Sequence, residues 1–394
     1  MSKNNQKKSA DFAKLSIKEH LKHGGKIFVG SKFKLVDKKD LSIAYTPGVA
    51  EVCTEIAKDK TQAKKLTLKK NTVAILSNGT AVLGLGNIGA EAAIPVMEGK
   101  AVLLKHFAGV DAFPICINTD DVEEVIKTVK NIQAVFGGIN LEDISAPNCF
   151  EIEERLKTEL DIPVMHDDQW GAATVTIAGI INALKVVKKK SSAVSVALVG
   201  AGAAGIATAK LLQVLGVKNL TVFDTKGAIH ASRTDLNKQK QEVLSLNTLN
   251  IKGELKENIE HFDIFIGLSK PNLLNSSDVS KMKKDPIIFA LANPTPEIMP
   301  DEAKKGGAKV VGTGRSDFPN QINNSLFFPG YWKGMLERSN KNKPKFDFLT
   351  EKKMYIKCAE AIAKMVKPTP DRILPSTLDK KVHTIVAKVV TNFK

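Results

Sequence analysis

The chain of 394 residues predicts an α/β fold with two domains. Apolar runs typical of buried strands alternate with helical segments along most of the sequence. A polar, lysine-rich stretch at Lys188–Ser192 separates two series of alternating strands and helices, which predicts a linker. We therefore expect a first α/β domain over residues 1–188 and a doubly wound second domain over 189–340. Helices over 341–394 are expected to pack back on the first domain.

The second domain opens with a strand, a glycine turn, a helix and another strand within Val194–Asp224. The turn has the G-x-G-x-x-G pattern, formed by Gly200, Gly202 and Gly205. Such glycines permit a tight bend, close backbone approach to a pyrophosphate and packing of helix on strand. Ala203 and Ala204 open the helix, whose N-terminus favours an anion. Asp224 ends the second strand, where a carboxylate accepts hydrogen bonds from ribose hydroxyls. The pattern predicts a Rossmann domain that binds a dinucleotide.

Two acidic pairs follow separate predicted strands of the first domain. Glu142 and Asp143 come directly after one strand, and Asp167 and Asp168 come after the next. In a parallel sheet both pairs would lie at the same edge, where ligands collect. Clustered carboxylates repel one another unless a cation lies among them, and oxygen ligands favour Mg²⁺ or Mn²⁺. The alternative is two solvated acidic loop ends.

A second glycine pattern in the first domain, Gly84-x-Gly86-x-x-Gly89, resembles the first one. No acidic residue ends its next apolar run, so we interpret it as a wall that a ligand approaches. The sequence predicts a short helix broken by Pro95, and then a strand over Ala101–Phe107 that begins beside Lys100. Partial desolvation there would lower the pKa of Lys100 and make it a usable base, although lysines at strand edges are common.

Tyr45 stands just before the turn signal Pro47-Gly48, with a helix expected from Val49. Taken alone, this tyrosine fits an interface or core aromatic.

The composition excludes several classes of function. The net charge is +16, but the basic residues are mostly scattered lysines, aromatic residues are few, and no nucleic-acid motif is present. The uncharged stretch Ser191–Ala209 belongs to the glycine turn rather than to a membrane span. Four widely spaced cysteines and a polar N-terminus predict free thiols in the cytoplasm, without a signal peptide. We expect neither a nucleic acid nor a membrane as partner.

Several blocks, in order along nearly the whole chain, resemble the small bacterial-type malic enzymes. They are AYTPGVA (44–50), NGTAVLGLGNIG (78–89), PVMEGKAVLLKHFAGVDAFPI (95–115), NLEDI (140–144), HDDQWG (166–171), GAGAAG (200–205), FALANPTPE (289–297) and NQINNSLFFPG (320–330). The resemblance is to the short form, without a phosphotransacetylase-like extension. It implies oxidative decarboxylation of L-malate to pyruvate and CO₂ with reduction of NAD(P)⁺, a Mg²⁺ or Mn²⁺ ion, and a homodimer.

The resemblance also assigns roles to residues. The metal ligands would be Glu142, Asp143 and Asp168. Lys100 would take the proton of the malate hydroxyl, with Asp167 orienting it, and Tyr45 would protonate C3 of enolpyruvate. The contacts to substrate and nicotinamide would come from Asn293, Asn323 and Asn324.

Two points stay open. Larger malic enzymes carry an arginine where this chain has Ala81, so the group that binds the distal carboxylate of malate is not identified. Asp224 favours NAD over NADP, although Lys226 could offset its repulsion of a 2′-phosphate. The alternatives to malic enzyme activity are malolactic or oxaloacetate-decarboxylating activity on the same scaffold and a non-catalytic NAD-binding protein.

Overall fold

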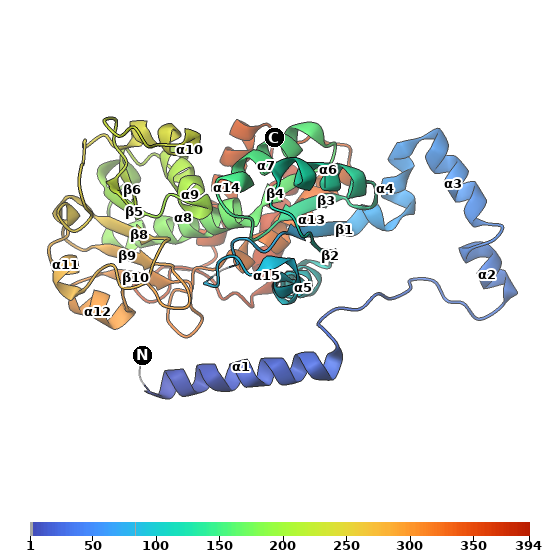
Figure 1. Ribbon diagram of the computed structural model, residues 1–394, viewed down its shortest axis with the longest axis horizontal. Coiled ribbons are helices and arrows are strands. Elements are labelled where there is room, and N and C mark those ends of the chain that lie inside the picture. Colours follow the sequence, from blue (N-terminus) through green and yellow to red (C-terminus); the bar gives the residue numbers. More distant parts are fainter. Residues whose placement is uncertain (1–2, 83) are drawn as a thin grey trace.

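The computed structural model describes residues 3–82 and 84–394, with side chains from Asp11 onward. Two β-sheets with helices packed on them form the body of the molecule, which confirms the predicted α/β class (Figure 1). Short 3-10 helices complete the connections: η1 Lys60–Gln62, η2 Leu68–Asn71, η3 Gln133–Val135, η4 Ser191–Ala193, η5 Leu244–Leu246, η6 Ile259–His261 and η7 Asn324–Leu326.

The first sheet has parallel strands in the order β2-β1-β3-β4. The strands are β1 Thr72–Ser77, β2 Asp111–Cys116, β3 Gly138–Leu141 and β4 Val164–His166. The helices of this half are α5 Gly89–Ala108, α6 Val122–Ile132 and α7 Asn148–Glu159. Leu141 at the end of β3 lies opposite His166 at the end of β4. The two acidic pairs therefore leave the sheet side by side, at the edge that the sequence predicts.

The second sheet has the order β10-β9-β8-β5-β6-β7. Its parallel strands are β5 Ser195–Val199, β6 Asn219–Asp224, β8 Ile264–Gly267, β9 Ile287–Ala290 and β10 Val310–Thr313, and β7 Gly227–Ala228 is antiparallel. The helices are α9 Ala203–Val214, α10 Lys238–Glu242, α11 Ser276–Ser280 and α12 Pro300–Lys305. The chain leaves β5 on one side for β6 and returns on the other as β8. This reversal is the switch point at which open α/β sheets bind ligands.

Four long helices connect the halves. α8 (Asp167–Val187) follows β4 directly and packs against α9 and α14 (Phe348–Ala363). α13 (Phe328–Asn340) packs on α5 and on α15 (Lys380–Asn392), so the chain returns to the first sheet from α13 onward. α8 has the length and hydropathy of a membrane span, but 78% of its most apolar window is buried inside the protein. It is therefore a core helix.

One predicted element is wrong. The apolar run Ala101–Phe107 is not a strand, because α5 continues as one helix from Gly89 to Ala108 with Pro95 inside it. Its buried residues recur every three or four positions, as a helix that covers a sheet requires: Ala90, Ala93, Met97, Lys100, Ala101, Leu104 and Ala108. Lys100 thus projects from the buried face of a helix rather than from the start of a strand.

The N-terminal arm, residues 3–62, contrasts with this body. It contains α1 Lys3–His23, α2 Lys38–Ala44 and α3 Val49–Lys58, and α4 Ala63–Leu66 follows it. Figure 1 shows α2 and α3 projecting away from the sheets. No residue from Asp11 to Asn71 is buried. Lys26 attaches the arm to α5, donating from its amide to Glu98 (3.2 Å) and from Nζ to the carbonyl of Pro95 (2.6 Å).

Candidate active site

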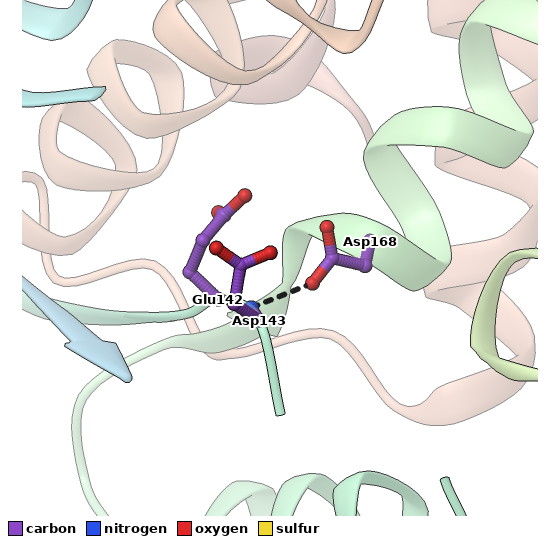
Figure 2. A group of neighbouring side chains, drawn as sticks. All are labelled: Glu142, Asp143 and Asp168. Carbon is purple, nitrogen blue, oxygen red and sulfur yellow. Dashed lines mark hydrogen bonds between the residues drawn. The ribbon is translucent and has the colours of Figure 1, made fainter. Parts of the chain in front are cut away.

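Three carboxylates meet where β3 and β4 end. Glu142 and Asp143 follow β3, and Asp168 belongs to the first turn of α8 (Figure 2). One oxygen from each lies within 4.8 Å of the others. The amide of Asp143 donates to Asp168 Oδ2 over 2.8 Å, and Asp143 adopts a left-handed φ of 53°. Aspartate tolerates this conformation better than most residues, which lets the chain turn tightly at the end of β3.

The electrostatics of this cluster favour a bound cation. Burial, together with repulsion from Asp168, raises the pKa of Asp143 to about 9, and burial is also the main reason that the pKa of Glu142 rises to about 7. Asp143 Oδ2 is buried and has no hydrogen-bond partner among the described residues. A divalent cation would offset the repulsion between the buried carboxylates and would give Asp143 Oδ2 a partner. Three carboxylates also match the oxygen ligands that Mg²⁺ and Mn²⁺ prefer. The residues present therefore fit the predicted metal.

Lys100 contacts the same cluster from α5. Its side chain is 9% exposed, and Nζ lies 2.9 Å from Glu142 Oε1 and donates to Asp167 Oδ2. The Nζ atom also lies 4.2 Å from the centre of the Phe328 ring. Burial favours the neutral amine, but the charges of Asp167 and Glu142 outweigh it and raise the pKa of Lys100. The lowered pKa predicted from desolvation alone is therefore wrong for this arrangement, because the prediction did not include the carboxylates.

Asp167 connects Lys100 to the second half of the chain. Its Oδ2 accepts from Lys100 and from Asn324 Nδ2, the latter over 2.9 Å. Its Oδ1 is buried without a partner among the described residues. A Cβ on Gly171, one turn along α8, would lie 1.8 Å from that Oδ1. Gly171 therefore makes room for the Asp167 carboxylate, a role that sequence analysis missed although the spacing of four residues is visible in HDDQWG.

The structure separates the two neighbouring asparagines. Asn323 turns its side chain back to accept from the amide of Ser325 over 2.9 Å, as the N-cap of η7. Asn324 instead reaches Asp167. Of the pair, Asn324 is the one whose side chain lies among the candidate catalytic groups.

Tyr45 is not part of this cluster. It lies between α2 and α3 in the N-terminal arm, and 67% of its surface is exposed. Figure 1 shows that segment well separated from α5 and β3.

Each glycine of the turn meets a different backbone or packing requirement. Gly200 has φ +115°, and a Cβ on Gly205 would lie 1.8 Å from the carbonyl oxygen of Gly200. A Cβ on Gly202 would meet no atom of the described residues within 4 Å. The space beside Gly202 is therefore open to a ligand, and Ala203 and Ala204 form the first turn of α9 directly beside it. Free amides at such a turn suit a pyrophosphate, so these residues fit the predicted dinucleotide.

Asn293 lies where the halves of the chain meet. A Cβ on Gly84 would lie 2.8 Å from the carbonyl oxygen of Asn293, and a Cβ on Gly314 would lie 2.5 Å from its Nδ2. The glycine wall of the first domain therefore packs against the Asn293 loop.

Ala81, which precedes the glycine wall, contacts the acidic cluster. Its amide donates to the carbonyl of Asp143 over 3.0 Å. The position at which larger malic enzymes carry an arginine is thus adjacent to the acidic cluster.

The residues that orient Glu142 are not evident from the sequence. Asn140, within β3, donates from Nδ2 to Glu142 Oε2 over 2.9 Å. The indole of Trp332 on α13 donates to Asn140 Oδ1 over 2.8 Å. A carboxylate anchored in this way has a fixed orientation toward a metal. The partners are 192 residues apart, so no local pattern could have linked them.

Comparison with known proteins agrees with this geometry. Residues 30–157 match the malic enzyme N-terminal domain family, and residues 170–393 match the malic enzyme NAD-binding domain family. The bifunctional malic/malolactic enzyme of Bacillus subtilis is 52% identical over 376 residues, which cover 94% of this chain and 90% of that protein. The NAD-dependent malic enzyme of Geobacillus stearothermophilus is 53% identical over 93% of this chain and 76% of its own length.

Solved structures give the same result. The crystal structure of the NAD-dependent malic enzyme of Thermotoga maritima superposes with a TM-score of 0.92 at 45% identity, covering 96% of this chain and 99% of that one. The malic enzyme of Entamoeba histolytica gives a TM-score of 0.91 at 37% identity, covering 98% of this chain and 81% of that one. With both domains matched and the acidic cluster in place, this chain belongs to the malic enzyme family.

Proposed function

We propose that the protein catalyses NAD-dependent oxidative decarboxylation of L-malate to pyruvate and CO₂. One observation carries the assignment of the site: an acidic trio, in which Glu142 and Asp143 are buried and Asp168 is part-buried, lies beside a buried Lys100–Asp167 pair. The trio suits a divalent cation, and the pair suits the removal of a proton from a hydroxyl group held there.

The acidic trio, Glu142, Asp143 and Asp168, would hold Mg²⁺ or Mn²⁺. When bound, such an ion polarises the C2 oxygen of malate as a Lewis acid. Lys100 takes the hydroxyl proton, for which it must first be neutral. Asp167 holds Lys100 at the cluster, and Asn324 holds Asp167, which supports a positioning role for both.

The nucleotide would bind across the glycine turn of the second domain. Gly202, Ala203 and Ala204 present open space and free amides to the pyrophosphate. NAD⁺ held there would supply the acceptor for the hydride that leaves C2 of malate. Asn293, which packs against the glycine wall, is proposed to contact substrate and nicotinamide, and Asn324 is proposed as a second amide on the substrate.

Tyr45 is proposed as the acid that protonates C3, supplied by the second copy of a homodimer. Half of the exposed large apolar side chains among the described residues lie between Phe12 and Tyr45. Phe28, for example, is 91% exposed. Exposed apolar surfaces of this kind are typical of interfaces, which supports our proposal that a second copy of the chain covers it. The same chain offers apolar side chains on the outer face of α5, namely Ile94, Val96 and Val102.

We propose a cytoplasmic location, which the state of the thiols supports. All four cysteines are free, two of them buried, which supports a reducing cytoplasm.

A second activity is favoured by one comparison. The Bacillus subtilis relative is named a bifunctional malic/malolactic enzyme, so we also consider conversion of malate to lactate and CO₂. The two activities are distinguished by their products, which are pyruvate with free NADH or lactate without it.

The test is an assay of malate-dependent NADH formation with Mn²⁺ or Mg²⁺, repeated with EDTA. We expect equal amounts of NADH and pyruvate, and loss of both with EDTA. Lactate as the main product would support the malolactic alternative. NADH formation that persists at full rate in EDTA would refute the metal assignment.

A further inference from the structure

The carboxylate of Asp224 already has four hydrogen-bond donors. Oδ1 accepts from the amide of Lys226 (2.9 Å) and from Arg233 Nη1 (2.7 Å). Oδ2 accepts from Arg233 Nη2 (3.0 Å) and from Lys240 Nζ (2.6 Å). A carboxylate has about four acceptor positions, so these donors fill them. Burial opposes ionisation, but Arg233 and Lys240 lower the pKa of Asp224 to about 2.

This arrangement lies at the nucleotide site. The amide of Gly200 donates to the carbonyl of Phe223 over 2.8 Å, so Asp224 comes next to the glycine turn. In Rossmann domains the adenosine ribose of the dinucleotide binds at this strand end, and an arginine there accommodates a 2′-phosphate. Here the carboxylate and the arginine are both present, and they pair with each other.

The cations outnumber the acids. Arg233 also pairs with Asp235, donating from Nη2 over 2.7 Å, and Lys226 Nζ lies 2.9 Å from the same carboxylate. Three cations and two carboxylates leave one positive charge when all are ionised. The side chain of Arg233 is 9% exposed, and its guanidinium donates one hydrogen bond to each oxygen of the Asp224 carboxylate. That fork matches a phosphate as well as a carboxylate.

We propose that Arg233 and Lys240 form a 2′-phosphate subsite that Asp224 keeps closed by pairing with both. Asp224 then determines the choice of cofactor in two ways: it repels a 2′-phosphate, and it occupies the cations that would bind one. Replacing this single carboxylate would open a complete NADP subsite. The inference rests on the proposed nucleotide site.

The test is equilibrium binding of two probes, 5′-AMP and adenosine 2′,5′-bisphosphate, measured by calorimetry. The unaltered protein should bind AMP more tightly than the bisphosphate. In Asp224→Asn, the Kd of the bisphosphate should fall at least about tenfold, because a charge-assisted bond contributes 1.4 kcal/mol or more. Adding Arg233→Ala to that variant should remove the gain. Asp235→Asn is the matched control, since it also loses a partner of Arg233 but leaves Asp224 in place, and it should keep the preference for AMP.

Two outcomes would overturn the inference. One is an Asp224→Asn protein that binds AMP but gains nothing for the bisphosphate, with Asp224→Ser giving the same result. The other is a gain that survives both Arg233→Ala and Lys240→Ala. Binding of AMP to the unaltered protein tests the nucleotide site separately, so failure of that site and failure of the subsite give different results.

Discussion

Lys100 Nζ lies 2.9 Å from Glu142 Oε1, and both side chains are buried. A candidate base therefore contacts a candidate metal ligand directly, without solvent between them. A cation among the carboxylates would compete with the lysine for their charge. Lys100 is thus positioned so that its amine would lose its proton only when a cation occupies the acidic cluster.

Lys100→Ala should abolish malate oxidation. General-base catalysis contributes at least about 100-fold, so kcat should fall by that factor or more, while NAD binding changes little. Steady-state NADH formation and NAD titration measure the two effects. Lys130→Ala is the control, since Lys130 forms an exposed ion pair with Glu159 away from the site. Near-normal turnover in Lys100→Ala would refute the base assignment.

Trp332→Phe should weaken metal binding without touching a ligand. It removes the indole donor that holds Asn140, which in turn holds Glu142. Loss of such an outer partner costs about 10-fold or more in metal affinity, so the Kd for Mn²⁺ should rise by that factor. Titration of Mn²⁺ by electron paramagnetic resonance measures it. Tyr331→Phe, which changes the adjacent side chain and its 3.4 Å contact with Glu351, should leave the Mn²⁺ affinity unchanged. Equal Kd values for Trp332→Phe and the parent would show that Trp332 only fills space.

Two glycines of the same motif should respond differently to alanine. Gly205→Ala places a Cβ 1.8 Å from a carbonyl oxygen, and overpacking of this kind costs about 1–3 kcal/mol or more, so Tm should fall. The methyl group of Gly202→Ala meets no atom within 4 Å in the part of the chain that the structure describes, so Tm should stay the same. NAD affinity should fall, because the methyl group occupies the ligand's space. Thermal melts and NAD titrations separate the two. If Gly202→Ala bound NAD normally, the pyrophosphate would have to lie elsewhere.

The features that depend on residues close together in the sequence could be predicted from it. The acidic pairs, the glycine turn and Asp224 each lie at or directly after the end of a strand, where the spacing within a short stretch of sequence predicts them. The strand predicted over Ala101–Phe107 was wrong, because the four consecutive apolar residues 101–104 show no helical period by themselves, and the period appears only once the buried positions of α5 are known. The pKa of Lys100 and the pairing of Asp224 with Arg233 depend on groups brought together by tertiary packing, which no single stretch of sequence reveals.

His383 should make the fold sensitive to acid. It is fully buried on α15, its ring centre lies 4.5 Å from that of Phe107, and burial lowers its pKa to about 4, with Asp379 opposing and His106 adding to the effect. Between pH 6.5 and 4 the unfolded chain binds a proton there that the folded protein does not, so stability falls as pH falls. Between pH 7.5 and pH 4.5 this histidine should lower the free energy of unfolding by about 2 kcal/mol.

His383→Leu should lose that part of the pH dependence, measured by urea unfolding at the two pH values. His261→Leu, which removes an exposed histidine, is the control and should behave like the parent. An identical loss of stability in His383→Leu and the parent would assign the acid sensitivity to other groups.

Tyr45 and Lys100 should act together only across two copies of the chain. Tyr45→Phe should lower overall malic activity while sparing oxaloacetate reduction, because only the late proton transfer is lost. A heterodimer of a Lys100→Ala chain with a Tyr45→Phe chain, isolated with two affinity tags, would contain one site with both native residues. It should regain about half of the parent activity, since one of two symmetric sites is intact. A heterodimer of Lys100→Ala with Asp167→Asn is the control: both changes lie in the body, so each site is damaged and no activity should return. If Tyr45 instead served the Lys100 of its own chain, the first heterodimer would have no intact site and would show no more than the residual activity of a Tyr45→Phe site.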